Sequence, residues 1–460
     1  MSYVTLVTLG CPKNQVDSDH LLRSLNTEGI YNTDSIEDSD IILVNTCGFI
    51  NDAKQESINE ILNLASHKAN GKKLVVFGCL SQRYKDELTA ELPEIDAIWG
   101  VDKQDEIVEY CKKMTLTMKA KYNSPSTNLV HDLSAIHDPS VTPAPLVIPA
   151  KAGIHHADWN RETAPSPLYA YIKIAEGCNR PCSYCVIPSI RGSFRSAPVR
   201  DILAEAEAFV RAGKKELILV AQDLTSYGRD VGYDLPRLIN DIASISGDFW
   251  IRLLYLYPTA LNDTLLDAIN GQDKVCKYLD IPLQHSEDVI LSAMGRGGSR
   301  THYQELISRL RRDVANVTLR TTLIVGYPGE TQKEFDGLKA FVIEAGFDCL
   351  GVFVYSDEEG TAAYQLTGKV SERIKQRRLD ELMSIQAKIS YEKNQRHVGR
   401  HFRAIIDETS DDFTIARMYC HAPEIDGSVV IRGQPPLKRD DFIDVLITSA
   451  LDYDLVGCLA

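Results

Sequence analysis

The chain has 460 residues, 44% hydrophobic and 25% charged, which is ordinary for a globular protein of two or three domains. It has no run of about 18 apolar residues and no basic segment followed by an apolar one at the N-terminus, so we expect no membrane span, no secretory signal and a cytoplasmic location. Its formal net charge of −14 disfavours a broad electrostatic contact with nucleic acid, and we expect no direct binding to it.

Residues 1–113 alternate strand-like and helix-like segments. The strand-like runs are residues 3–9, 41–44, 74–77 and 97–99, and the amphipathic segments are residues 16–28, 53–68 and 82–92. This alternation predicts an α/β domain with an open parallel sheet and helices on both of its faces.

One cysteine follows each of the first three strand-like runs. Cys11 lies in TLGCPKN, Cys47 in VNTCGFI and Cys79 in VFGCLSQ, and a glycine adjoins each of them. Because ligands bind beyond the carboxyl ends of strands in open parallel sheets, we expect these sheet cysteines to converge at one edge. The adjacent glycines let the backbone approach a bulky cluster. Three buried packing cysteines are the alternative, but the repeated position favours an iron–sulfur site with three ligands.

Residues 114–167 are the predicted linker, or an insertion. Seven prolines and little periodicity indicate an irregular segment without a core to join. His155 and His156 lie within it, and we interpret them as part of a solvated loop rather than as metal ligands.

A second cysteine set occupies one short loop, EGCNRPCSYCVIP. These barrel cysteines, Cys178, Cys182 and Cys185, have the spacing C-x3-C-x2-C and no fourth cysteine nearby. Closed structural metal sites use four protein ligands, whereas reactive sites keep one position open. A four-iron cluster on three cysteines would likewise leave one iron free to bind a small molecule. A zinc site and three unrelated cysteines are the alternatives.

Residues 168–392 carry six strand-like runs separated by helical segments. The runs are residues 170–175, 216–221, 250–255, 278–283, 318–325 and 350–355. Six units fall short of the eight that close a full barrel, so we predict a (β/α)6 partial barrel with its site in the loops after the strands. Those loops carry the barrel cysteines, Gln222, Gln284 and the sequence GYPGE at 326–330.

Residues 395–460 change to short strand-like runs separated by turn residues. This pattern predicts a small antiparallel β-barrel of five strands. Residues 396–460 contain seven Arg and Lys but eleven Asp and Glu. The negative excess suits a basic protein as partner better than RNA.

Seven phrases carry a resemblance to a known family: TLGCPKNQVDSD, NTCGFI, IPSIRG, DIPLQH, TLIVGYPGE, YSDEEGTAAY and APEIDG. With them the chain resembles the methylthiotransferase family of radical S-adenosylmethionine (SAM) enzymes. The resemblance covers all but the linker, and implies an N-terminal cluster domain, a radical SAM partial barrel and a C-terminal TRAM barrel. It is closest to the branch that adds a methylthio group to the β-carbon of an aspartate in ribosomal small-subunit protein 12.

Two departures bear on this resemblance. The tRNA-modifying branch has a serine and basic residues after its second cysteine, where this chain has Gly48, Phe49 and Ile50. Asp357 stands where proline is commoner, a difference to which we attach no functional weight.

The resemblance also implies two 4Fe-4S clusters and SAM as cofactors, with an electron donor such as flavodoxin or ferredoxin as partner. The cluster on the barrel cysteines would bind SAM and cleave it to a radical that abstracts hydrogen, and the cluster on the sheet cysteines would present the sulfur. Strand-end positions and the resemblance together give four candidates for contacts with SAM: Gln222, Gln284, Arg320 and Ile324.

Three other functions compete with this interpretation. One is a tRNA methylthiotransferase acting on isopentenylated adenosine next to the anticodon, which a basic C-terminal barrel would have favoured. The others are an electron carrier with two clusters, for which no such barrel is needed, and a zinc-binding scaffold.

Overall fold

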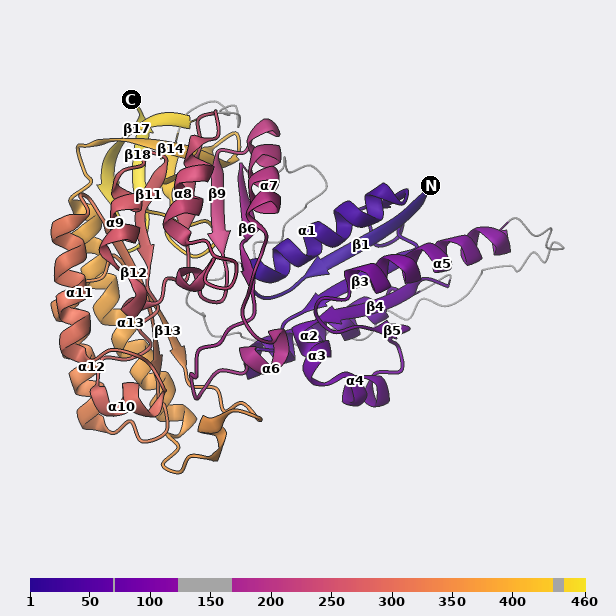
Figure 1. The fold of residues 1–460 in the computed structure, drawn as a ribbon, viewed down its shortest axis with the longest axis horizontal. Coiled ribbons are helices and arrows are strands. Elements are labelled where there is room, and N and C mark those ends of the chain that lie inside the picture. Colours follow the sequence, from indigo (N-terminus) through magenta and orange to yellow (C-terminus); the bar gives the residue numbers. More distant parts are fainter. Residues whose placement is uncertain (69–70, 123–167, 433–441) are drawn as a thin grey trace, which may run out of the picture.

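The computed structural model of the protein describes residues 1–68, 71–122, 168–432 and 442–460. Figure 1 shows an N-terminal α/β domain beside a larger body, in which a six-stranded sheet and its helices lie below a small closed β-barrel. This is the three-part architecture that the sequence predicts. Within the described residues, no helix combines the length and the apolar character needed to cross a membrane.

The N-terminal domain is a parallel sheet of five strands in the order β2-β1-β3-β4-β5. Its elements are β1 (Ser2–Thr8), α1 (Pro12–Thr27), β2 (Ile30–Asn32), β3 (Ile41–Thr46), α2 (Asn51–Ala65), β4 (Lys73–Gly78), α3 (Cys79–Arg83), α4 (Lys85–Glu91), β5 (Ala97–Ile98) and α5 (Gln104–Tyr122). Helices α1 and α5 pack on one face through Leu21, Leu25 and Ile107, and α2 packs on the other through Ile61 and Leu64. Helices therefore cover both faces, as expected.

Three details of this domain differ from the sequence prediction. The edge strand β2 was not predicted, because three residues are too short to show an alternating pattern. The helix expected over 82–92 is two helices, which break at Tyr84 (φ −130°, ψ 38°). Helix α5 continues to Tyr122, so the first residues of the segment predicted as a linker are helical. Residues 123–167, with the two histidines of the linker, lie outside the described residues.

The central sheet has six parallel strands in the order β13-β12-β11-β10-β9-β6. Its strands are β6 (Tyr169–Lys173), β9 (Glu216–Val220), β10 (Trp250–Leu253), β11 (Val275–Asp280), β12 (Thr318–Val325) and β13 (Cys349–Val354). A separate pair, β7 (Ala175–Glu176) and β8 (Arg195–Ser196), flanks the cysteine loop. The first and last strands of the sheet are not paired with each other, so this is the predicted partial barrel.

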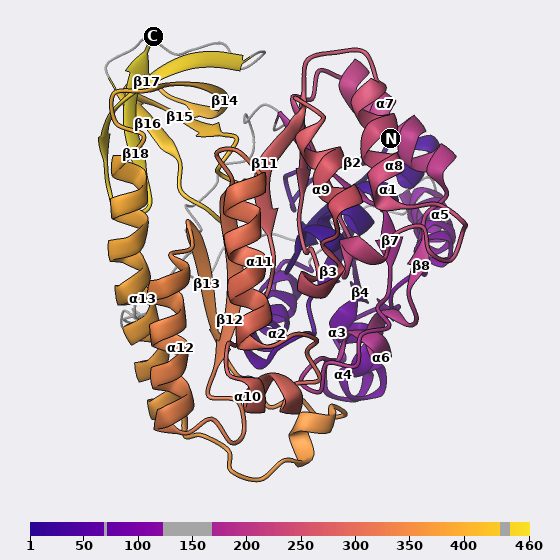
Figure 2. The same cartoon turned by 60° about the vertical axis from the view of Figure 1, so that its left-hand side comes forward.

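Helices cover the outer face of this sheet (Figure 2). They are α7 (Val199–Arg211), α8 (Leu235–Ser244), α9 (Asp263–Asn270), α10 (Asp288–Ala293), α11 (Arg300–Asp313), α12 (Gln332–Ala345) and α13 (Glu372–Gln395), with short 3-10 turns at Leu224–Ser226, Pro258–Ala260 and Ala362–Gln365. Helix α6 (Ile187–Arg191) instead follows the cysteine loop and packs against α3 of the N-terminal domain. The largest apolar core lies between the strands and the long helices. Helix α12 begins with the capping box that Thr331 and Glu334 predict.

Helix α13 has 24 residues and was not predicted. Several of the side chains that it buries are polar: Lys375, Arg378, Gln386 and Ser390. They bond to neighbouring segments, as when Lys375 Nζ donates to the Tyr355 carbonyl at 2.8 Å. An apolar stripe, the usual sequence signal of a packed helix, is therefore weak here.

The C-terminal strands close into a five-stranded barrel, as predicted. They are β14 (His401–Thr409), β15 (Phe413–Met418), β16 (Val429–Arg432), β17 (Phe442–Ala450) and β18 (Leu455–Leu459). Four of its five strand pairs are antiparallel, and β16 and β18 pair in parallel. Closing an odd number of strands requires one parallel pair, since alternating directions cannot match around the ring.

Buried charges dock this C-terminal barrel inside the open end of the central sheet. Glu216 on β9 accepts from Arg252 at 2.6 Å and from Arg417 of β15 at 2.8 Å. Asp426, in the APEIDG segment, accepts from the Tyr278 hydroxyl at 2.6 Å. Removing one partner would leave a buried charge uncompensated, so these contacts fix how the two barrels sit.

Candidate active site between the two cysteine sets

The sheet cysteines follow three adjacent strands of the N-terminal domain. Cys11 caps the start of α1 after β1, Cys47 follows β3, and Cys79 opens α3 after β4. The thiols of Cys47 and Cys79 both interact electrostatically with Cys11. A Cβ added to Gly10 would lie 2.9 Å from the sulfur of Cys47, so the first loop passes close over the second. The structure thus brings the three together, and their role as ligands stays a prediction.

Burial changes the chemistry of these thiols. It raises the pKa of Cys47 to about 12 and that of Cys79 to about 11. Both are therefore neutral near pH 7 in the absence of metal. Because thiolates are the metal-binding form, loading this set with iron must release protons.

The barrel cysteines lie on the loop between β7 and α6. The Cys178 amide donates to the Gly192 carbonyl at 3.2 Å, and the Cys185 amide donates to the Cys182 carbonyl at 3.1 Å. Gly177 has φ +76°, and a Cβ there would lie 2.3 Å from the Ser193 carbonyl oxygen. The loop therefore folds tightly on itself, in a conformation that needs glycine.

Two arginines lie beside this loop, and both contact the same aromatic ring. The guanidinium groups of Arg180 and Arg296 lie 3.7 and 4.4 Å from the ring centre of Tyr257. Arg296 also donates to the sulfur of Cys182 at 3.6 Å, and the Arg180 amide donates to the sulfur of Cys178 at 3.4 Å. Burial raises the pKa of the Cys178 thiol, and the hydrogen bond from the Arg180 amide opposes this without outweighing it.

A buried network joins the two cysteine sets. The Arg191 guanidinium, from α6, donates to Glu176 at 3.0 Å and to Asp17 of α1 at 3.0 Å. It also donates at 2.6 Å to the side-chain oxygen of Asn14, which lies 3.7 Å from the sulfur of Cys79. Although burial opposes it, the charges of Lys173 and Arg191 lower the pKa of Glu176 to about 2. Glu176 is therefore a carboxylate, held two residues before Cys178.

Sequence reasoning missed most of this network. Asn14 and Asp17 lie three residues apart on α1, so their side chains share one helix face next to Cys11, a signal that could have been used. Arg191 falls in the phrase IPSIRG, but nothing in its spacing shows that it reaches into another domain.

Gln222, one predicted SAM contact, lies at the end of β9 beside the barrel cysteines. Its amide nitrogen donates to Glu176 at 3.0 Å, and its amide oxygen is buried without a hydrogen-bond partner. A buried acceptor of this kind fits a site that is completed by a donor group of a ligand. Its contact with SAM stays a prediction.

The other three predicted SAM contacts lie on the next strands. Gln284 has a left-handed backbone (φ +76°), a strained conformation typical of functional sites, and pairs through its backbone with β12. Ile324 of β12 packs in an apolar cluster that includes Tyr184 of the cysteine loop. The guanidinium of Arg320 lies 2.9 Å from Asp280 and 3.4 Å from Asp426, so it takes part in the contact between the two barrels. The contacts of these three residues with SAM stay predictions.

The donor chemistry of the two sets fits iron–sulfur clusters. Each set offers three thiols, beside positively charged groups and left-handed glycines. Within the described ranges no group of three or more His, Cys, Asp or Glu side chains could hold a metal ion as placed. In a four-iron cluster each cysteine would bind a different iron, so its ligands need not meet at one point.

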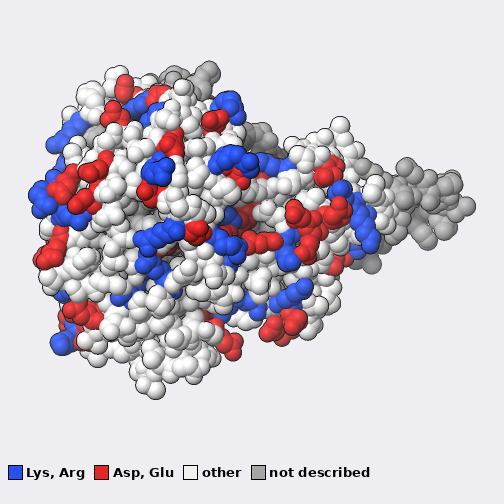
Figure 3. Space-filling view, in the orientation of Figure 1, with Lys and Arg blue, Asp and Glu red and all other residues white. Residues whose placement is uncertain are grey.

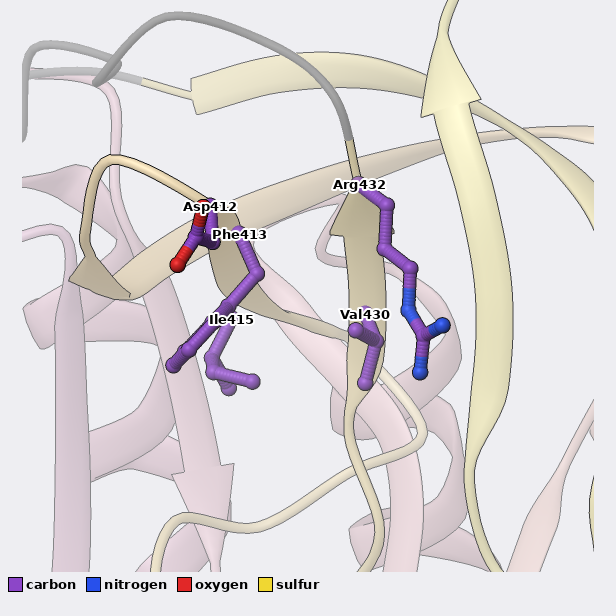
Figure 4. Close-up of a pocket in the computed structure, with 5 residues that line it drawn as sticks. All are labelled: Asp412, Phe413, Ile415, Val430 and Arg432. Carbon is purple, nitrogen blue, oxygen red and sulfur yellow. The ribbon is translucent and has the colours of Figure 1, made fainter.

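Other surface features do not belong to this site. Figure 3 shows Lys and Arg beside Asp and Glu across one face, without a broad field of either sign. A hollow of about 390 Å³ lies on the C-terminal barrel, lined by Asp412, Phe413, Ile415, Val430 and Arg432 (Figure 4). It lies in a different domain from either cysteine set.

Three known families match successive parts of the chain. Residues 3–100 match the uncharacterized protein family UPF0004, residues 172–342 the radical SAM superfamily, and residues 398–459 the TRAM domain. The sheet cysteines lie in the first match and the barrel cysteines in the second.

Two curated relatives match over the whole chain. A protein of Thermodesulfovibrio yellowstonii is 47% identical over 100% of both chains, and one of Geobacter sulfurreducens is 42% identical over 99% of this chain and 98% of its own. Both are named ribosomal protein uS12 methylthiotransferase RimO.

Among solved structures, the radical SAM methyltransferase TsrM from Kitasatospora setae, determined with cobalamin and a 4Fe-4S cluster, has a similar fold. The two align with a TM-score of 0.51 and 14% identity, over 77% of this chain and 75% of that one. At this identity the likeness concerns the fold alone.

Proposed function

The chain belongs to the family of ribosomal protein uS12 methylthiotransferases RimO, and from this premise we propose that it attaches a methylthio group to uS12 at the β-carbon of an aspartate. It is a radical SAM methylthiotransferase, and its radical SAM domain uses an iron–sulfur cluster and SAM. We further propose two 4Fe-4S clusters, one on each cysteine set. The observation that carries the proposal is the buried network that joins two sets of three cysteines in one chain.

Each group has its own residues in this proposal. The sheet cysteines (Cys11, Cys47 and Cys79) hold one cluster, and the barrel cysteines (Cys178, Cys182 and Cys185) hold the other. Gln222, Gln284, Arg320 and Ile324 would contact SAM, with the amide oxygen of Gln222, which has no hydrogen-bond partner, as an acceptor. When bound, these cofactors supply the one-electron chemistry and the sulfur that no protein side chain could provide.

The side chains of the chain position and shield these groups. Arg191 ties α1 to the strand that leads into the cysteine loop, so the two sets keep a fixed separation. Arg296 and Arg180 place positive charge beside the barrel cysteines, and both guanidinium groups contact the ring of Tyr257. The C-terminal barrel closes the far end of the central sheet through Glu216 and Asp426, which excludes water from that side.

We also propose domains at 1–113, 168–392 and 395–460, with α5 extending into the linker. A small electron-transfer protein such as flavodoxin or ferredoxin supplies electrons, and the enzyme works in the cytoplasm with the ribosomal protein. The tRNA alternative is not favoured, because full-length relatives at 42–47% identity are named for uS12.

The mass of uS12 tests the proposal directly. Anaerobically loaded protein, with SAM, a reductant and a sulfide source, is incubated with purified uS12 or with isopentenylated tRNA. We expect uS12 to gain one methylthio group in place of one hydrogen, and uS12 with the target aspartate changed to alanine to stay unmodified. Modification of the tRNA but not of uS12 would overturn the proposal.

A further inference from the structure

Lys13 is a buried cation without a carboxylate partner. Its residue is 9% exposed, and its titratable neighbours are Tyr255, Cys11 and Arg191, with no described carboxylate in an ion pair with it. The other lysines and arginines that are buried to this degree each have a carboxylate oxygen within 3.2 Å: they are Arg191, Arg252, Lys375, Arg378 and Arg417. A charge withdrawn from water needs a counter-charge, so Lys13 stands out as a group whose natural partner is an anion.

Lys13 lies where the N-terminal domain meets the central sheet. It is the second residue of α1, two residues after Cys11, and its ammonium lies 3.5 Å from the ring centre of Tyr255. Tyr255 follows β10 of the central sheet, so this contact crosses from one domain to the other. The ring faces the cation but cannot neutralise it.

Tyr255 is itself held in an unusual conformation. Its φ is +65°, which is costly for a tyrosine. Its amide donates to Asp280 at 3.0 Å, and its carbonyl accepts from the Leu224 amide at 3.1 Å. Two neighbouring strand ends thus hold the ring under Lys13, as expected where a side chain must be placed accurately.

We propose that Lys13 binds the carboxylate of the substrate aspartate. This inference rests on the proposed function: if one cysteine set supplies the radical and the other the sulfur, the reacting carbon must lie between the two sets. The β-carbon of aspartate is bonded directly to the carboxylate carbon, so an aspartate reacting there brings its negative charge to the same junction. Lys13 then pairs with a carboxylate only when the correct residue is bound, and asparagine, which has no charge, binds more weakly.

Two peptides that carry the uS12 target sequence, one with aspartate and one with asparagine, test this. Dissociation constants for cluster-loaded protein are measured by fluorescence anisotropy, and kcat/KM is measured by mass spectrometry. For the unmodified chain we expect a preference for aspartate of roughly 10- to 100-fold, the range for a hydrogen bond to a charged group. Lys13→Met should reduce this preference to less than about threefold.

The matched control is Lys103→Met. Lys103 lies in the same domain, pairs with Glu106 at 2.5 Å and is half-exposed, so its replacement removes the same charge from the surface. We expect it to keep the aspartate preference. Iron content per chain checks that each variant is loaded. If Lys13→Met loses iron, the measurement on the protein without substitutions still tests the proposal. Equal binding and turnover of the two peptides by that protein would overturn it.

If cluster-loaded Lys13→Met keeps the preference for the aspartate peptide, the proposal is also overturned. A shifted reduction potential of the cluster on the sheet cysteines in that variant would show that Lys13 compensates the charge of the cluster. The proposed function fails separately. If neither peptide nor intact uS12 is modified by the unmodified chain, the substrate is wrong, whereas modification of aspartate with no role for Lys13 leaves the function standing.

Discussion

The two cysteine sets reach similar chemistry by opposite routes. The barrel cysteines lie within eight residues of one loop, and all three are partly exposed. The sheet cysteines come from three loops between residues 11 and 79, and two of the three are buried. The first set needs only its loop to be folded, whereas the second exists only when three parallel strands are aligned. The barrel set should therefore tolerate damage to the N-terminal sheet better than the sheet set does.

The largest expected effect comes from emptying one set at a time. Unmodified protein should hold about eight irons, and replacing the three barrel cysteines by alanine should leave roughly half and abolish SAM cleavage and methylthio transfer. Cys47→Ala should also abolish transfer, while cleavage of SAM persists because the barrel set stays loaded. Iron analysis and deoxyadenosine formation measure these outcomes. Loss of all cleavage in folded, half-loaded Cys47→Ala would contradict the division of roles.

The network between the sets should give the next largest effect. Arg191→Met leaves the buried carboxylate of Glu176 and the half-buried carboxylate of Asp17 with only Lys173 between them, and should lower the free energy of unfolding by about 3–5 kcal/mol. Urea unfolding measures this change. The control is Arg195→Met, which removes an exposed ion pair with Asp102 and should cost less than about 1 kcal/mol. Equal costs would show that the network does not hold the domains together.

Glycine replacements separate the two loops. Gly177→Ala should cost the barrel set its iron, because the Cβ would lie 2.3 Å from the Ser193 carbonyl oxygen. Gly10→Ala should cost the sheet set its iron, because the Cβ would lie 2.7 Å from the Cβ of Cys47. Gly213→Ala is the control: its φ is +84°, but no atom lies within 4 Å of the added Cβ. It should lose only about 1–2 kcal/mol and no iron. Iron loss from both sets in either loop variant would mean that the sets are not independent.

The smallest expected effect is a pH dependence of stability, and it arises at His421, which follows β15 of the C-terminal barrel. Burial lowers the pKa of His421 to about 3, against 6.5 when exposed. Between these values the unfolded chain binds the extra proton, so the free energy of unfolding falls as the pH falls below 6.5, by about 1.4 kcal/mol per pH unit. Urea unfolding at pH 7.5 and 5.5 measures it. Burial raises the pKa of Glu330 to about 7, which acts in the opposite direction.

The comparison with His421→Gln isolates this histidine. The variant should show a weaker dependence on pH by about 1 kcal/mol over that interval. An identical dependence would show that His421 takes up its proton without unfolding.

Much of the fold could be read from the sequence because its elements are periodic and regular. The six strands of the partial barrel lie where the apolar runs predicted them, and Cys178, Cys182 and Cys185 lie on one loop, as their spacing predicted. Strand β2 and helix α13 could not be read in this way, because one is three residues long and the other buries lysine, arginine and glutamine. Arg320 shows the same limit within the site, since its carboxylate partner Asp426 lies 106 positions further along the chain.

The sequence by itself determined the order of the three domains, the two sets of three cysteines and the family, because these depend on local spacing and composition. Only the tertiary structure decided that Arg191 joins both sets through Asp17 and Glu176, and that Lys13 is buried against Tyr255 without a carboxylate. The physical reason is that the cost and pairing of a buried charge depend on what surrounds it. Those neighbours come from distant parts of the chain.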